Sequence, residues 1–334
     1  MARREASAGR VASERNLFLS PRIKLMNRRN LLTSVMTAGA GLMAFDGKEV
    51  FSESAKTRRS TGKDFPTSFI ETPDHAALFY RDWGVGKTAV FVHSWAVNSE
   101  LWQYHMIYLV DQGMRCIAYD QRGHGRSSDP GQGYDPDTLA DDLAAVIEQM
   151  SLREVTLVGH SMGCGQIVRY LSRHGASRIR RIVFVSPTTP FSLKTADNPE
   201  GIDRGALERL RATWRKDFPK WLAENARPFF TPETSPEMVQ WGVRMCLQTS
   251  LKAIIECNRT DTETDYRAEL QKLSLPTLII HGDADVSANI DRMGRKTALL
   301  IPGSRFKAYE GAPHGLMFTH ADRLNGDLLE FVNQ

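Results

Sequence analysis

The feature of this sequence that most constrains its fold is a regular alternation, from about residue 64 onward, of short apolar runs with longer segments of helical periodicity. Short continuous apolar runs are typical of strands that are buried on both faces. The sequence therefore predicts an α/β fold, in which helices cover both faces of a mostly parallel sheet. The strand candidates are Val90–His93, Cys116–Asp120, Val155–Gly159, Ile182–Ser186, Thr277–His281 and Arg305–Tyr309.

Three of the predicted helices have clear ends. Asp135 is a suitable N-cap, Pro136 suits the first turn, and the apolar residues from Leu139 to Met150 fall on one face. A second helix is predicted over residues 162–174, where Gly175 provides a good C-terminal stop. A third is predicted over residues 322–332.

The alternation breaks at about residues 191–266, where aromatic-rich helical segments replace the strand signal. An insertion of this kind between two strands predicts a helical cap over the carboxyl ends of the strands. Ligands bind at that edge in open α/β sheets. We therefore expect some cap aromatics to line a substrate pocket, namely Trp214, Trp221, Phe229 and Phe230.

Charge separates the first sixty residues from the rest. Residues 1–60 contain 12 Lys and Arg and 5 Asp and Glu, whereas the remaining residues carry a net charge of −3. The excess of positive charge in the whole chain therefore belongs to a leader and linker, residues 1–63, and not to the domain predicted over residues 64–334. Nothing in the domain indicates nucleic-acid binding.

Within the leader, residues 26–50 have the pattern of an export signal. Arg28 and Arg29 precede an apolar run of about 15 residues, shorter than the roughly 20 that a spanning helix needs. Paired arginines in this position resemble the signal read by the twin-arginine export machinery. We expect export to the periplasm, with translation starting at Met26. A disordered basic tail, which leaves the protein in the cytoplasm, and an uncleaved anchor are the alternatives.

The sharpest local signal is Gly159-His160-Ser161-Met162-Gly163, which lies between a predicted strand and a predicted helix. An abrupt strand-to-helix turn strains the backbone of its central residue and presses neighbouring chains together, so the flanking residues must be small. Such a turn projects the serine hydroxyl above the sheet, at the start of a helix whose dipole favours negative charge. Ser161 is therefore the candidate nucleophile.

Several segments in the same order resemble the α/β-hydrolase family, and within it the arylesterases and cofactor-free haloperoxidases (perhydrolases). The resemblance covers roughly residues 66–333, about four-fifths of the chain. Besides the serine turn, it depends on His93-Ser94-Trp95, Asp120-Gln121-Arg122-Gly123-His124-Gly125-Arg126-Ser127, His281-Gly282-Asp283-Ala284-Asp285 and Gly311-Ala312-Pro313-His314-Gly315-Leu316.

The resemblance implies a catalytic triad in the chain order serine, acid, histidine. Beyond the cap, His281 ends a strand and His320 falls in the last helix, whereas His314 lies in a loop after the last predicted strand. His314 is therefore the expected base. Asp283 and Asp285 compete for the acid, and the family spacing favours Asp285, with Asp283 bonding its own backbone in a turn.

The family position of the oxyanion hole implies the backbone amides of Trp95 and Met162. Ser94 stands where the family has glycine, which could disturb the loop. Ala96 follows Trp95, whereas members that favour perhydrolysis carry proline there.

The resemblance implies hydrolysis of carboxylic esters with an aryl or apolar part, without metal or other cofactor. The alternative is formation of peracids from a carboxylic acid and hydrogen peroxide, and a non-catalytic ligand-binding role is a third reading. The four cysteines form no metal-binding pattern, although a disulfide between Cys246 and Cys257 is one option. The oligomeric state cannot be read from the sequence.

Overall fold

The computed structural model describes residues 68–334 and contains one sheet of eight strands in the order β1-β2-β4-β3-β5-β6-β7-β8. The leader and its expected export signal lie outside these residues. β2 pairs antiparallel with β1 and β4, and all other pairs are parallel. The strands are β1 (Phe69–Glu71), β2 (Ala77–Gly84), β3 (Lys87–Val92), β4 (Met114–Tyr119), β5 (Val155–His160), β6 (Ile179–Val185), β7 (Thr277–Gly282) and β8 (Arg305–Tyr309).

The predicted mostly parallel sheet is therefore confirmed, and burial explains why its strands could be recognised. All six residues of β5 are buried, and both of its neighbours, β3 and β6, are largely buried. β1 and β2 were not among the strand candidates. β1 has only three residues, and Arg81 and Asp82 interrupt the apolar run of β2.

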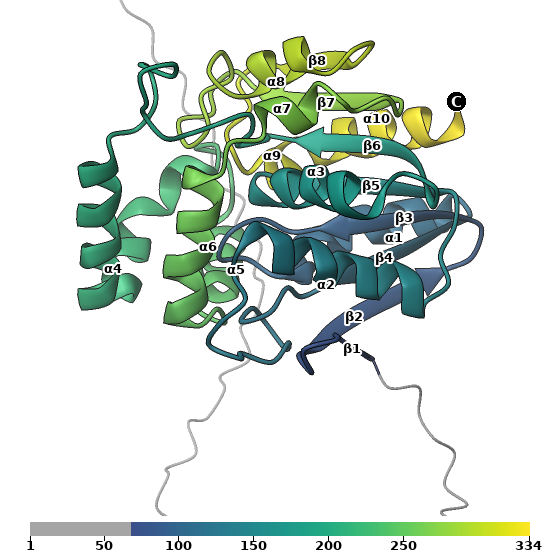
Figure 1. Ribbon diagram of the computed structural model, residues 1–334, viewed down its shortest axis with the longest axis horizontal. Helices are drawn as coiled ribbons and strands as arrows, with labels where there is room; N and C mark the ends of the chain where they lie inside the picture. Colours follow the sequence, from purple (N-terminus) through teal and green to yellow (C-terminus); the bar gives the residue numbers. More distant parts are fainter. Residues whose placement is uncertain (1–67) are drawn as a thin grey trace, which may run out of the picture. The chain divides into compact units, whose positions relative to one another are not determined.

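Helices cover both faces of the sheet (Figure 1). α2 (Pro136–Gln149) and α3 (Met162–His174) pack on one face through residues such as Leu143 and Ile167. α1 (Gln103–Asp111) and α10 (Ala321–Asn333) lie against the other face, where the core includes Trp102 and Phe331. Two separate apolar cores thus hold β3 and β5 rigidly in the middle of the sheet.

The predicted helix ends agree closely with the structure. The Asp135 carboxylate accepts a hydrogen bond from the Thr138 amide, at 3.0 Å, and so caps α2. α3 ends at His174, and Gly175 follows it with φ +74°, a left-handed conformation that glycine adopts without strain.

Between β6 and β7 the chain forms only helices and short irregular segments, apart from isolated bridges. Asp217 departs from helical geometry two residues before Pro219 and kinks α4. Figure 1 shows α4, α5 and α6 beyond the end toward which the parallel strands point. These inserted helices are α4 (Arg204–Asn225), η2 (Arg227–Phe229), α5 (Pro236–Cys246), α6 (Leu251–Glu263) and α7 (Arg267–Leu270).

Two further observations concern residues 68–334. All four cysteines are free, so the structure contains no disulfide between Cys246 and Cys257. No helix of this part of the chain combines the length and the apolar character needed to cross a membrane.

Candidate active site

Ser161 occupies the turn between β5 and α3 in a strained backbone conformation, with φ +53° and ψ −118°. The glycines on either side permit this turn. A Cβ on Gly163 would lie 2.6 Å from the Val92 carbonyl oxygen, and one on Gly159 would lie 2.9 Å from the Gly163 backbone. Close approach of β3, β5 and α3 therefore excludes side chains at both positions.

The structure brings Ser161, His314 and Asp285 together in one hydrogen-bonded chain. The His314 Nε2 atom lies 3.0 Å from the Ser161 Oγ atom, and its Nδ1 atom lies 2.6 Å from the Asp285 Oδ2 atom. His314 comes from the loop between β8 and α9 (Leu316–Thr319), and Asp285 from the loop after β7. All three side chains are buried. When its Nδ1–H donates a hydrogen bond to the carboxylate, the imidazole presents a free Nε2 lone pair to the hydroxyl.

Four hydrogen bonds hold the Asp285 carboxylate. Its Oδ1 atom accepts from the amides of Ser287 and Ala288, at 2.9 and 2.7 Å, and its Oδ2 atom accepts from His314 and His281. Burial raises the pKa of Asp285, but the charge of His314 and these hydrogen bonds outweigh it and hold the pKa well below its usual range. The carboxylate is therefore ionised and fixed in direction.

Two histidines support this arrangement in ways that the sequence did not reveal. The Nε2 atom of His281 lies 3.1 Å from the Asp285 Oδ2 atom and 2.7 Å from the Ala288 carbonyl oxygen, so its N–H is shared between them. His160 donates from Nε2 to the His314 carbonyl oxygen at 3.1 Å. Burial holds the pKa of His160 well below its usual value, so this ring is neutral. Both histidines fix the loops that carry Asp285 and His314.

Asp283 also acts on a neighbouring loop, contrary to expectation. Its Oδ1 atom accepts a hydrogen bond from the Gly311 amide, at 2.7 Å, instead of bonding its own backbone. The carboxylate is exposed and anchors the loop that leads to His314. His320, expected inside the last helix, lies between α9 and α10.

The backbone amides of Trp95 and Met162 donate to no acceptor within residues 68–334. Met162 is the first residue of α3, where an amide has no partner within the helix. The Trp95 loop is held by His93, whose ring lies 2.8 Å from the Ser94 carbonyl oxygen and 2.9 Å from the Gln121 amide nitrogen. Ser94 is not among the residues with positive φ, whereas Ala96 has φ +66°. Ser94 therefore does not need the backbone freedom of the glycine that the family has at this position.

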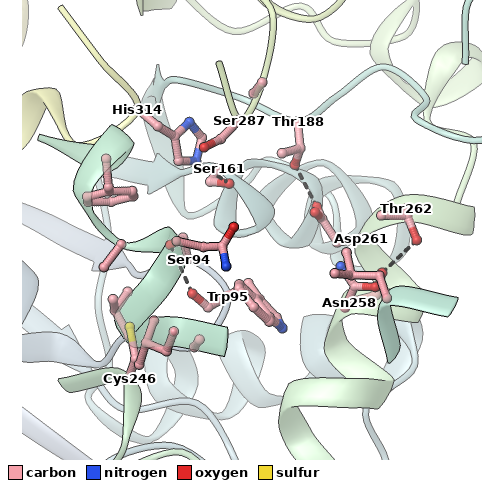
Figure 2. Close-up of a pocket in the computed structure, with 18 of the residues that line it drawn as sticks. Ser94, Trp95, Ser161, Thr188, Cys246, Asn258, Asp261, Thr262, Ser287 and His314 are labelled. Carbon is pink, nitrogen blue, oxygen red and sulfur yellow. Dashed lines mark hydrogen bonds between the residues drawn. The ribbon is translucent and has the colours of Figure 1, made fainter. Parts of the chain in front are cut away.

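A cavity of about 360 Å³ opens next to Ser161 and His314 (Figure 2). The four cap aromatics expected in a substrate pocket all line it, together with Trp95 and Phe318. The Trp95 ring lies 4.8 Å from that of Trp214, centre to centre. Because this wall is mainly aromatic, it suits an apolar or aryl group.

Another part of the cavity wall is polar, which the sequence did not predict. Its side chains come from the segment after β6, from α6 and from the acid loop. Hydroxyl, amide and carboxyl groups are common on protein surfaces, so no local pattern marks them as pocket residues. The polar residues concerned are Thr188, Ser192, Asn258, Asp261, Thr262 and Ser287.

The cap and the loop that carries His314 also touch directly. The Gly315 amide donates to the Phe229 carbonyl oxygen at 3.0 Å, and the Phe229 ring lies 5.5 Å from that of His314. A Cβ on Gly315 would lie 2.3 Å from the Phe229 carbonyl oxygen, so this contact requires glycine. In the described part of the chain, no group of three or more His, Cys, Asp or Glu side chains is arranged to hold a metal ion.

A mostly parallel sheet with a buried serine on its central strand-to-helix turn defines the class of α/β hydrolases. Comparison with known proteins agrees, because a family model described as the alpha/beta hydrolase fold matches residues 88–238. The chain is 38% identical over 270 residues to the non-heme chloroperoxidase CPO-A1 of Kitasatospora aureofaciens, covering 79% of this chain and 98% of that protein. This protein therefore belongs to the α/β-hydrolase family, as its resemblance predicted.

Two further similarities show the range of activities among its relatives. The chain is 32% identical over 273 residues to the bifunctional esterase/perhydrolase DCH of Acinetobacter calcoaceticus, covering 79% of this chain and 99% of that protein. It also matches the crystal structure of a bromoperoxidase from Bacillus anthracis with a TM-score of 0.77 and 36% identity, covering 80% of this chain and 99% of the other. Relatives of the same fold are thus named for both ester hydrolysis and peroxide chemistry.

Proposed function

We propose that this protein is a serine hydrolase that cleaves carboxylic esters through an acyl-enzyme. The observation that carries the proposal is the hydrogen-bonded chain from Ser161 through His314 to Asp285, beside a cavity of substrate size. A serine hydroxyl is a poor nucleophile until a base accepts its proton, and His314 lies within hydrogen-bond distance of it.

In the proposed reaction the Ser161 oxygen attacks the ester carbonyl while its proton passes to the His314 Nε2 atom. The developing oxyanion accepts hydrogen bonds from the Trp95 and Met162 amides, each worth about 3 kcal/mol of barrier lowering in comparable sites. Asp285 stabilises the imidazolium and takes no proton. His314 then protonates the leaving alcohol, and an acyl-serine remains.

In the second half, His314 takes a proton from water, which attacks the acyl-serine and releases the carboxylic acid. Hydrogen peroxide in place of water would release a peracid. This second candidate is favoured by the relatives named as haloperoxidases. Ala96 counts against this candidate, because family members that favour perhydrolysis carry proline at this position. A proline ring fixes φ near −65° and could not adopt the φ of +66° that Ala96 has, so the backbone here differs from the one that proline requires.

The test is a panel of p-nitrophenyl esters of graded acyl length, assayed with the wild type and Ser161→Ala. We expect hydrolysis that prefers apolar or aryl acyl groups and disappears in the variant. Peracid formation from acetate and hydrogen peroxide is measured on the same preparations. A peracid rate that exceeds ester hydrolysis at modest peroxide would reverse the order of the two candidates, and absence of both would favour a binding role.

A further inference from the structure

Asp261 is a carboxylate in the wall of the substrate cavity that forms no ion pair within the described residues. It lies in the last turn of α6, and its Oδ1 atom accepts a hydrogen bond from the Thr188 hydroxyl at 2.6 Å (Figure 2). Within residues 68–334, its other oxygen has no hydrogen-bond partner, and no Lys, Arg or His forms an ion pair with it. The carboxylate therefore lines the cavity without an ion-pair partner in this part of the chain.

Arg211 contacts two residues of this polar wall, Asn258 and Thr262, but it forms no ion pair with Asp261. Arg211 is fully buried, and its Nε atom donates to the Asn258 side chain, one helical turn before Asp261. Its remaining nitrogens donate to Glu208, Glu263 and Thr262. Arg211 thus orients the polar side of α6 without neutralising Asp261.

The position of Asp261 in its helix does not stabilise a negative charge. The end of a helix carries partial negative charge, so a carboxylate in its last turn is unfavourable. Burial raises the pKa of Asp261 to about 6, although the Thr188 hydrogen bond and the charge of His314 oppose this rise. A cationic ligand in the cavity would offset the cost of partly burying this carboxylate without an ion-pair partner.

The cavity also offers the other group that binds organic cations. Trp95, Trp214 and Trp221 line it, and their ring centres lie within 6.2 Å of one another. Aromatic faces attract ammonium groups through the ring quadrupole, and such rings together with a carboxylate form a binding site for substituted ammonium ions. An apolar ester would use the aromatic wall alone and leave Asp261 without a function.

We propose that Asp261 is a specificity-determining residue that binds the ammonium group of a cationic ester while Ser161 attacks the carbonyl. The substrate class is an ester with an apolar or aryl body and an ammonium group on one end. The inference rests on the proposed ester hydrolysis, and it narrows the substrate from apolar esters in general to cationic ones.

The kinetic test compares two p-nitrophenyl esters of the same shape, one ending in trimethylammonium and the other in tert-butyl, over a series of linker lengths. At the best length we expect the wild type to prefer the cationic ester by about tenfold in kcat/KM. Asp261→Asn should abolish this preference and change kcat/KM for the tert-butyl ester by less than about threefold. Glu256→Gln is the matched control, because it removes a carboxylate of α6 that does not line the cavity.

Binding of hexyltrimethylammonium, measured by calorimetry, tests the site without turnover. Wild type and Ser161→Ala should bind it equally, and Asp261→Asn about tenfold more weakly. Asp261→Ser replaces the asparagine variant if that one folds poorly. Equal binding by all variants, or equal rates on both esters, would overturn the inference. Binding that depends on Asp261 without turnover of any ester would instead refute the proposed hydrolysis.

Discussion

The cavity is built from two regions that the sequence specifies very differently, the loops at the strand ends and the inserted helices α4–α6. The loops supply Ser161, Asp285 and His314 in fixed mutual geometry, whereas the helices supply most of the aromatic wall and Asp261. In the proposed reaction the chemistry depends on backbone turns, which require particular residues. Substrate choice depends on side chains whose neighbours are set only by helix packing. The two regions should therefore respond differently to mutation.

The largest expected effect is loss of the nucleophile or the base. Ser161→Ala or His314→Ala should reduce kcat for a p-nitrophenyl ester by about 10⁶-fold, because the serine and its base act as a unit. Trp221→Ala in the cap should instead raise KM by roughly tenfold and leave kcat within a few-fold. Steady-state kinetics of the three variants measures whether kcat or KM changes, and circular dichroism verifies that each variant folds. A cap variant as inactive as Ser161→Ala would break the distinction between the two regions.

Next in size is the pair of aspartates in the loop after β7. Asp285→Asn should reduce kcat by about 10⁴-fold, since the amide cannot hold the required tautomer of His314. Asp283→Asn should reduce kcat by less than about tenfold, because the amide oxygen of the asparagine can still accept the hydrogen bond from the Gly311 amide. The two substitutions have the same chemistry and lie two residues apart, so each is the control for the other. The reverse order of effects would show that the acid is misassigned.

A smaller effect is expected at Ala96, where the Trp95 loop meets the cap. The Ala96 carbonyl oxygen accepts from the Thr249 hydroxyl at 2.8 Å, and its backbone has φ +66°. Ala96→Pro must change that φ, so we expect a loss of about 1–3 kcal/mol in the free energy of unfolding. The ratio of peracid formation to ester hydrolysis should rise, and Ala96→Gly should leave both stability and ratio nearly unchanged. Unaltered stability in the proline variant would show that the strained backbone is not required.

The effect that is smallest at neutral pH, and that grows as the pH falls, is a loss of stability that comes from buried histidines near the Trp95 loop. Burial lowers the pKa of His93 to about 4, and burial together with the neighbouring His93 lowers that of His124 to about 3. In the unfolded chain both titrate near pH 6.5, so the unfolded state binds more protons below that pH. The free energy of unfolding should therefore fall as the pH drops from about 6.5 to 4.

Each of these two buried histidines lowers the free energy of unfolding by up to about 1.4 kcal/mol for each pH unit below 6.5. Urea denaturation of the wild type and His124→Gln between pH 7 and pH 4 measures it, and the variant should show a shallower slope. His75, which is exposed and bonded to Glu71, provides the control position. Equal slopes in wild type and His124→Gln would contradict burial of a neutral ring at that position.

The strands also differ in how well the sequence predicts them. Buried strands such as β5 and β7 were located almost to the residue, because continuous apolar runs and glycine-flanked turns reflect local constraints. β2 was missed because Arg81 and Asp82 lie within it. Its pairing with β4 depends on contacts distant in sequence.

In the site, the serine turn together with the chain order and spacing of the α/β-hydrolase family singled out Ser161, Asp285 and His314, which the structure brings together. The supporting hydrogen bonds of His281 and His160 could not be predicted, because each joins residues that only the finished sheet brings close. Asp261 was missed for a related reason. An aspartate near a helix end resembles any solvated surface residue until the packing of α6 against the cavity is known.

The central claim, that Ser161 is the nucleophile, is tested most directly by covalent trapping. The folded protein is treated with a fluorophosphonate probe, digested, and analysed by mass spectrometry to locate the modified residue. We expect one adduct, on the peptide that contains Ser161, and strongly reduced labelling in His314→Ala. Unlabelled Ser161 in active, folded enzyme, or an adduct on another residue that accompanies loss of activity, would contradict it.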